Sequence, residues 1–250
     1  MYLGKKISIV FPVYNEKENI RNAIEEFLAH PAVDEIIAVD NNSKDGSDVE
    51  IKNTSAVYVL ETTQGYGAAL RRGMSEATGD LIVTCEPDGT FRASDLDRLL
   101  VYSLDYDVVF GTRTARNPVW SDGDPGVNMD FALRMGNWSV AKLLEFLFNG
   151  PSLTDVGCTF KLIHRRAYEH IKDAFTVDGN WFSPEFMLRA LEHKLSVVEI
   201  PVQYGARVGT SKITGKRSKA ILLGLRMIRF IVVERIRSWM RPTATHSAHE

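Results

Sequence analysis

Short apolar runs alternate with longer amphipathic segments through the first half of the chain. The runs are rich in β-branched residues, which predicts buried strands over residues 7–11, 35–40, 57–60, 81–85 and 108–111. The longer segments place apolar side chains three and four positions apart, which predicts helices; the clearest row is Ile20, Ile24, Phe27 and Leu28. Strands that alternate with helices at this spacing predict an α/β fold with a Rossmann-like, doubly wound, mostly parallel sheet.

The second half of the chain is less regular. Residues 116–130 contain Pro, Gly and Asp without periodicity, which predicts a loop. Two further helices and a last strand are expected over 129–148, 182–193 and 197–204. Ser183 is expected to cap the second of these helices.

Polar side chains follow the predicted strands at the points where each strand ends. Pro12 should end the first strand, and Asn15 is a candidate cap for the helix after it. Because the carboxyl ends of parallel strands meet at one edge, where ligands bind, these side chains should collect there. They are Tyr14, Glu16, Asp40, Glu86, Asp88 and Arg113. Asp40 also suits a purely structural turn.

The turn Glu86-Pro87-Asp88 carries the most specific chemistry. Pro87 lacks a backbone donor, so strand pairing should stop here and the chain should leave the sheet. Two carboxylates beside this turn offer the hard oxygen ligands that Mg²⁺ or Mn²⁺ prefers when it bridges phosphates. The alternative is an ordinary acidic turn in contact with water. Further along, Gly67 predicts a close approach of backbone to ligand at a helix start.

Composition narrows the possible partners. The 250 residues are 44% hydrophobic with a formal net charge of −2, which argues against nucleic acid as the main partner. Cys85 and Cys158 form no metal-type pair and predict reduced thiols in a cytosolic setting. The sequence shows no signal peptide and no uncharged apolar run long enough for a spanning helix.

The last helical segment, residues 216–241, has an uneven charge distribution. It holds eight Lys and Arg against one acid, Glu234. Apolar residues recur on one helical face, namely Ile221, Leu225, Ile228, Val232, Ile236 and Trp239. This pattern is typical of a helix that lies in a membrane interface, although a helix packed on the domain would show a similar row.

Together these motifs resemble the inverting nucleotide-sugar glycosyltransferases of family two, and within it the dolichyl- and polyprenyl-phosphate sugar synthases. The resemblance implies a GT-A fold over residues 1–215; the charge pattern adds a membrane-surface helix over 216–241, and residues 242–250 are expected to form a disordered tail. The motifs that carry it are residues 10–16, 40–47, 65–67, 86–88, 111–113, 155–161 and 207–212. Glu86 stands where the family has Asp and reaches one methylene further.

Carried over position by position, the resemblance assigns a role to each motif. Nucleotide binding falls to Pro12, Tyr14, Glu16, Asp40 and Gly67, and metal binding to Glu86 and Asp88. Asp155 corresponds to a catalytic acid near the reacting centre, and phosphate binding falls to Arg113, Arg134, Arg207, Ser211 and Lys212. Two simpler roles are also open. Arg113 could pair with an acid at the sheet edge, and Asp155 could cap its own glycine-containing turn.

The resulting hypothesis is a metal-dependent transfer of a hexose from a GDP- or UDP-sugar to a polyprenyl or dolichyl phosphate. The enzyme would work at the cytoplasmic face of the membrane, recruited by its last helix or by a small membrane partner protein. One alternative is a saccharide or protein hydroxyl acceptor, which needs a base such as Asp155. Another is a non-catalytic nucleotide-sugar-binding adaptor, prompted by Glu86.

Overall fold

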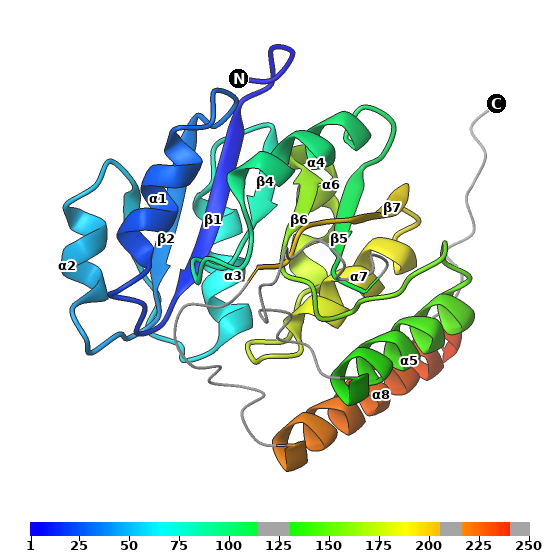
Figure 1. The fold of residues 1–250 in the computed structure, drawn as a ribbon. Helices are drawn as coiled ribbons and strands as arrows, with labels where there is room; N and C mark the ends of the chain where they lie inside the picture. Colours follow the sequence, from blue (N-terminus) through cyan, green and yellow to red (C-terminus); the bar gives the residue numbers. More distant parts are fainter. Residues whose placement is uncertain (115–130, 206–216, 241–250) are drawn as a thin grey trace.

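A computed structural model describes residues 1–114, 131–205 and 217–240. Within these ranges the strands form one sheet in the order β3-β2-β1-β4-β6-β5-β7 (Figure 1). They are β1 (Ile7–Val13), β2 (Glu35–Asp40), β3 (Val57–Leu60), β4 (Leu81–Thr84), β5 (Val108–Thr112), β6 (Lys161–His164) and β7 (Val197–Pro201). Only β6 runs antiparallel to its neighbours among the described strands, so the predicted doubly wound, mostly parallel sheet is confirmed.

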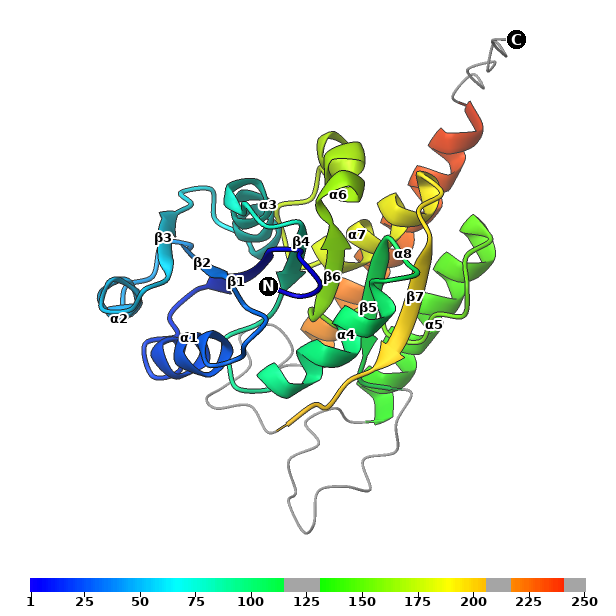
Figure 2. The same cartoon turned by 90° about the horizontal axis from the view of Figure 1, so that it is seen from above.

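Helices cover both faces of this sheet, as the view from above shows (Figure 2). One face packs against α1 (Ile20–Leu28), α2 (Ser47–Lys52) and α4 (Leu96–Tyr102). The other is covered by α3 (Tyr66–Glu76), α5 (Phe131–Phe148), α6 (Arg165–Ile171) and α7 (Phe182–Glu192), and α8 (Arg217–Met240) packs on α5 and α7. Short 3-10 turns span Ala93–Asp95 and Lys172–Ala174. Alternate residues of β1 serve the two cores, with Val10 on one side and Ile9 and Phe11 on the other.

The first strand continues through Pro12, so the prediction that it ends there is wrong. Pro12 pairs in register with Val39 of β2. Val10, two residues earlier on the same side of β1, accepts a hydrogen bond from Cys85 N at the end of β4. Because β4 ends at Thr84, no neighbouring strand needs a donor from Pro12. β1 and β4 therefore part near Pro12, and this is where an open α/β sheet forms its ligand crevice.

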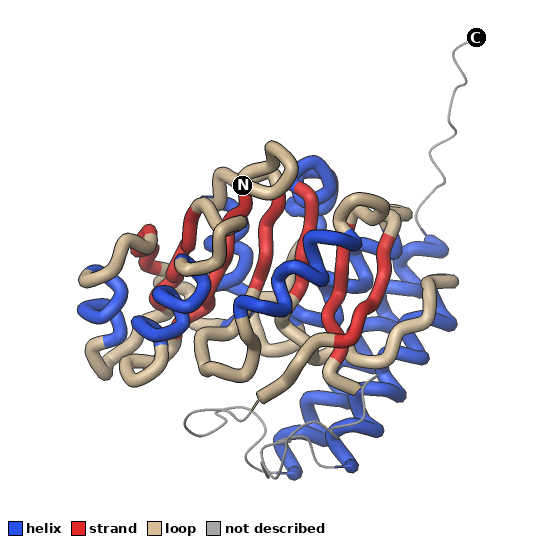
Figure 3. The backbone as a smooth tube through the Cα atoms, turned by 45° about the horizontal axis from the view of Figure 1, so that its top comes forward, coloured by secondary structure: helices blue, strands red, loops and turns tan. Residues whose placement is uncertain are grey.

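The last helix, α8, lies beside α5 along one side of the domain (Figures 1 and 3). It packs through Met227 and Ile231, and Arg189 of α7 reaches Glu234 at 2.6 Å. Among the described helices none combines the length and apolar character needed to cross a bilayer. The predicted tail, residues 242–250, lies outside the described residues. Cys85 and Cys158 are free and buried, as the sequence predicts for reduced thiols.

Candidate active site

The loops that leave β1 and β2 are fastened to each other at the carboxyl edge of the sheet. Asn15 N donates to Ser43 Oγ at 3.0 Å, and Asn15 Oδ1 accepts from Lys44 N at 2.8 Å. Glu16 N donates to Ser47 Oγ at 2.8 Å. Asn15 adopts a left-handed backbone with φ 53°, a conformation that Asn tolerates better than most residues. The prediction of Asn15 as a helix cap is therefore wrong, since α1 begins only at Ile20.

Asn41 joins the end of β2 to the loop that leads into α3. Its side-chain nitrogen donates to Glu61 O at 2.9 Å and to Thr63 O at 2.8 Å. Its Oδ1 accepts from Gly65 N at 2.8 Å and from Gln64 Nε2 at 2.9 Å. Sequence reasoning treated this residue only as part of a turn. The one available signal was its place directly after a predicted strand.

The predicted nucleotide-binding residues lie on these same loops. Pro12 is buried in β1, Tyr14 is exposed, and Glu16 is half-buried and accepts from Asn19 Nδ2 at 2.9 Å. Asp40 is nearly buried, and its Oδ1 accepts from Ser43 N at 3.0 Å. Asp40 therefore holds its own turn, the structural role that its position also allowed.

Gly67 has a packing reason that differs from the predicted approach to a ligand. A Cβ at Gly67 would lie 2.3 Å from Val177 O and 2.9 Å from the Cβ of Phe182. At the neighbouring Gly65, a Cβ would lie 2.1 Å from Asp178 O. The close approach at the start of α3 is thus made by the protein's own backbone at residues 177–178.

The Glu86-Pro87-Asp88 turn leaves β4 at the predicted edge, beside Tyr204. Glu86 is half-buried, whereas Asp88 is 1% exposed, and its Oδ1 accepts from Thr90 N at 3.1 Å and from Thr90 Oγ1 at 2.6 Å. Burial raises the pKa of Tyr204, Arg113 opposes that shift, and the charges of Glu86 and Asp88 add to it. Gly205 N donates to Thr90 O at 2.8 Å, and the ring centroids of Phe91 and Tyr204 lie 5.6 Å apart, so this turn and Tyr204 lie on the same side of the sheet edge.

The donor set of this turn suits a metal that is shared with a ligand. No group of three or more His, Cys, Asp or Glu in the described parts of the chain is arranged to hold a metal ion. The protein would supply two carboxylates here, and Mg²⁺ commonly completes such a site with substrate phosphates and water. The arrangement fits Mg²⁺ or Mn²⁺ bound together with a diphosphate, and it does not fit an all-protein cage.

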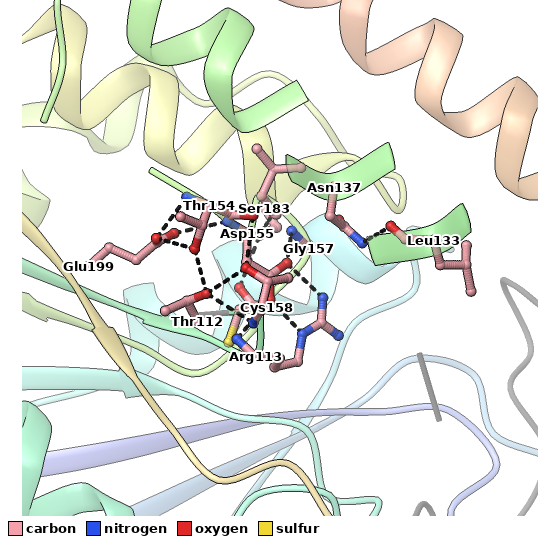
Figure 4. Close-up of polar contacts among 12 residues, drawn as sticks. Thr112, Arg113, Leu133, Asn137, Thr154, Asp155, Gly157, Cys158, Ser183 and Glu199 are labelled. Carbon is pink, nitrogen blue, oxygen red and sulfur yellow. Dashed lines mark hydrogen bonds and ion pairs between the residues drawn. The ribbon is translucent and has the colours of Figure 1, made fainter. Parts of the chain in front are cut away.

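A buried ion pair between Arg113 and Asp155 forms the centre of the site (Figure 4). Asp155 Oδ2 accepts from Arg113 N at 3.0 Å and from Arg113 Nε at 2.7 Å. Its Oδ1 accepts from Arg113 Nη2 at 2.9 Å and from Gly157 N at 3.0 Å. Asp155 is 0% exposed. Burial alone would raise the pKa of Asp155, but the Arg113 guanidinium outweighs burial and holds this pKa below its usual range.

Neighbouring side chains fix the backbone around this pair. Glu199 of β7 accepts from Thr154 N at 2.7 Å and from Asp155 N at 3.0 Å, and burial raises the pKa of Glu199 (Figure 4). Ser183 Oγ donates to Val156 O at 2.6 Å. The predicted capping role of Ser183 is therefore wrong, because α7 begins one residue earlier and this hydroxyl supports the Asp155 turn.

Two more side chains complete the cluster, and sequence reasoning missed both. Lys161 is 1% exposed, and its Nζ donates to Cys158 O and, at 2.8 Å, to Ser183 Oγ. Burial lowers the pKa of Lys161. Tyr204 stacks against Arg113, with the guanidinium carbon 5.0 Å from the ring centroid. The sequence signal was a Lys at the start of a short strand and a Tyr just after the last one.

The predicted phosphate-binding residues are only partly described. Arg113 lies in the pair with Asp155, and Arg134 of α5 donates to Thr114 O at 2.9 Å, which places both on the same side of the site. Arg207, Ser211 and Lys212 lie outside the described residues. The structure thus brings together Glu86, Asp88, Arg113, Asp155 and Tyr204.

Paired carboxylates at the carboxyl edge of a mostly parallel sheet, next to a basic cluster, define a GT-A type glycosyltransferase. Solved structures share this fold. Glucosyl-3-phosphoglycerate synthase from Mycobacterium tuberculosis, in complex with Mn²⁺, UDP and glucosyl-3-phosphoglycerate, gives a TM-score of 0.67 at 17% identity, covering 96% of this chain and 82% of that chain. The same enzyme has also been crystallised with Mg²⁺ and UDP. Another mycobacterial protein gives a TM-score of 0.71 at 16% identity, covering 93% of this chain and 75% of that chain.

Sequence comparison gives the family. Residues 8–172 match Glycosyl transferase family 2. The chain is 30% identical over 223 residues to an uncharacterized glycosyltransferase of Mycobacterium tuberculosis, across 88% of this chain and 94% of that protein. It is also 30% identical over 222 residues to the undecaprenyl-phosphate 4-deoxy-4-formamido-L-arabinose transferase of Sodalis glossinidius, across 83% of this chain and 62% of that protein. The chain belongs to glycosyl transferase family 2 and is a nucleotide-sugar-dependent glycosyltransferase.

Proposed function

We propose that this glycosyltransferase moves a hexose from a GDP- or UDP-sugar to the phosphate of a polyprenyl phosphate, with inversion at the anomeric carbon. A phosphate oxygen of the acceptor attacks the anomeric carbon, the bond to the donor diphosphate breaks, and the nucleoside diphosphate leaves with the bonding electrons. The name of the Sodalis relative, which acts on undecaprenyl phosphate, supports this acceptor class.

The observation that carries the proposal is the full engagement of Asp155. A hydroxyl acceptor needs a base that can take its proton. Both oxygens of Asp155 accept hydrogen bonds from Arg113, and the pKa of Asp155 is lowered, so this carboxylate is poorly suited to that work. A lipid phosphate is already ionised and needs cationic groups to hold it instead. Arg113 and Arg134 lie on that side of the site.

In this proposal each part of the sheet edge has a distinct task. The fastened loops after β1 and β2 hold the base and ribose of the donor. Glu86 and Asp88 hold Mg²⁺ or Mn²⁺ on the diphosphate, and the ion, when bound, neutralises the charge that builds up on the leaving group. Asp155 acts as a positioning residue that fixes the guanidinium of Arg113. Alignment of the acceptor phosphate with the anomeric carbon supplies much of the remaining rate enhancement.

The test uses purified full-length protein with a panel of labelled GDP- and UDP-sugars, Mg²⁺ and a polyprenyl phosphate in detergent. Label should pass to the lipid phosphate with at least one donor. The matched control acceptor is the same polyprenol without its phosphate, which should receive no label. Equal or faster transfer to the polyprenol, or to a saccharide hydroxyl, would overturn the proposal. Metal-independent donor binding without any turnover would favour the non-catalytic adaptor.

A further inference from the structure

The last helix, α8, packs on the domain through a different side from the one its apolar row occupies. Ile231 is 0% exposed, and Met227 is buried beside it. Glu234, on the same packed side, accepts from Arg189 of α7 at 2.6 Å and from Arg237 at 2.6 Å. Packing on the domain is therefore achieved without the residues that the sequence pattern placed on one face.

Those residues remain exposed in the folded protein. Leu225 is 59% exposed and Trp239 is 67% exposed, and the other members of the row are exposed as well. We call these residues the α8 row: Ile221, Leu225, Ile228, Val232, Ile236 and Trp239. The helix beside it, α5 (Figure 1), also has exposed apolar side chains, Trp138 and Phe146. An exposed apolar row as long as the α8 row is typical of an interaction surface.

The charges beside the α8 row have one sign. Arg226 and Arg229 are exposed, and neither forms an ion pair with a carboxylate within the described residues; the Arg226 guanidinium carbon lies 5.9 Å from the centroid of the Trp181 ring. The single acid of α8, Glu234, is buried and committed to Arg189 and Arg237. The surface therefore combines apolar side chains with unneutralised guanidinium groups.

We propose that the α8 row and its flanking arginines dock onto an anionic lipid bilayer, with α8 lying in the plane of the interface. Anionic headgroups supply the negative charge that the protein does not, and Trp239 has the amphipathic ring that favours the interface. A second copy of the chain fits this surface poorly. A two-fold contact along the row would bring the arginines of both copies together, with no exposed acid on α8 to separate them.

Docking in this way would bring the active site to the headgroup layer, a consequence that rests on the proposed function. Helix α5, which lies beside α8, begins next to the Arg113–Asp155 pair. Its Asn137 Oδ1 lies 2.5 Å from the position that a Cβ atom would take at Gly157. Its Arg134 side chain donates a hydrogen bond to Thr114 O at 2.9 Å. Arg134, proposed to bind the acceptor phosphate, therefore lies on the helix that packs against α8.

The test measures co-sedimentation of the full-length protein with vesicles of phosphatidylcholine, with and without about one quarter phosphatidylglycerol, near physiological salt. Three double variants are compared: L225Q/I236Q in the α8 row, R226Q/R229Q beside it, and V49Q/V101Q as a matched control of exposed apolar residues on α2 and α4. We expect binding only to the anionic vesicles. The first variant should weaken it about tenfold and the second about twentyfold, with the control unchanged.

Thermal unfolding checks that each variant is folded, and light scattering reports the oligomeric state. Absence of binding to anionic vesicles, or equal binding by all variants, overturns the proposal. A third outcome is a parent protein that forms a dimer and does not bind vesicles, with the dimer lost in L225Q/I236Q. That result would assign the surface to a second copy of the chain and would also overturn the proposal. The vesicle assay contains no donor or acceptor. Vesicle binding without sugar transfer to lipid phosphate would therefore overturn only the proposed function. Sugar transfer without vesicle binding would overturn only the docking proposal.

Discussion

Two sets of carboxylates lie at the same edge of the sheet, and their surroundings give them different chemistry. Glu86 and Asp88 follow β4 in one turn, and Asp88 is anchored there by the neutral Thr90. Asp155 is held from several directions by Arg113 and Gly157. In our proposal the first set holds a metal ion, whereas the charge of Asp155 is matched within the protein by Arg113. The partners of a carboxylate, more than its place at a strand end, determine what it can do.

Replacing Asp88 by Asn should have the largest effect, because it removes a charge proposed to hold the metal while keeping an oxygen for Thr90. We expect transfer to fall about 10³-fold with little change in stability. The measurement is kcat as a function of Mg²⁺ concentration, together with the melting temperature. Asp97→Asn on the exposed side of α4 is the matched control. Unchanged metal dependence would remove Asp88 from the metal site.

Replacing Asp155 by Asn should act first on stability. Arg113 would then remain buried without its counter-charge, which costs about 3–5 kcal/mol of unfolding free energy. Urea unfolding measures this loss, and the double variant Asp155→Asn/Arg113→Gln should recover part of it without recovering transfer. If Asp155→Asn kept full stability and lost only kcat, Asp155 would be acting directly on the acceptor.

The pH dependence of stability should show the same pair. The folded-state pKa of Asp155 is lowered, so its contribution is complete above the unfolded-state value of about 3.9 and is lost as the pH falls through the folded-state pKa. The urea midpoint of the parent protein should therefore fall more steeply below about pH 4 than that of Asp155→Asn/Arg113→Gln. Parallel curves for the two proteins would show that the pair makes no such contribution.

Substitutions of Tyr204 should have the smallest effect on stability. They test the contact of Arg113 with the aromatic ring, on the side away from Asp155. Tyr204→Leu should remove a cation–π contact worth about 1 kcal/mol, while Tyr204→Phe should keep most of it. Urea unfolding measures the stability of each variant, and the affinity for acceptor phosphate shows whether the guanidinium has moved. An equal loss in both variants would point to the phenol oxygen in place of the ring.

Local patterns predicted much of the fold because the central strands β1, β2, β4 and β5 are short apolar runs that are almost fully buried. The sheet, its doubly wound order and the helices α3, α5 and α7 follow from such patterns. Pro12 was misread because a proline ends a strand only where a neighbouring strand needs its missing donor. The antiparallel direction of β6 depends on which strands it meets, and local sequence does not record that.

For the site, the sequence predicted which sheet edge carries the polar residues better than it predicted their hydrogen-bond partners. It placed Glu86, Asp88 and Arg113 together, and their proximity to Tyr204 agrees with this. The roles of Asn15, Asn41 and Ser183 depend on partners 20 or more residues away in the chain, so local capping rules misjudged them. The packing of Gly67 likewise depends on a distant neighbour, the backbone at Val177, and its predicted nucleotide-binding role stays a prediction.

The buried guanidinium of Arg189 bears on whether α8 belongs to the same folding unit as the rest of the domain. It bonds Glu234 of α8 and Glu192 of α7 at 2.6 and 2.7 Å, and Glu185, its third partner, also accepts from Val177 N beside Gly67. A chain cut before α8 would remove one of the three carboxylates around that cation and expose the guanidinium to water. The terminal helix and the start of α3 therefore belong to one cooperative unit, and truncation would loosen the catalytic body as well as the helix removed.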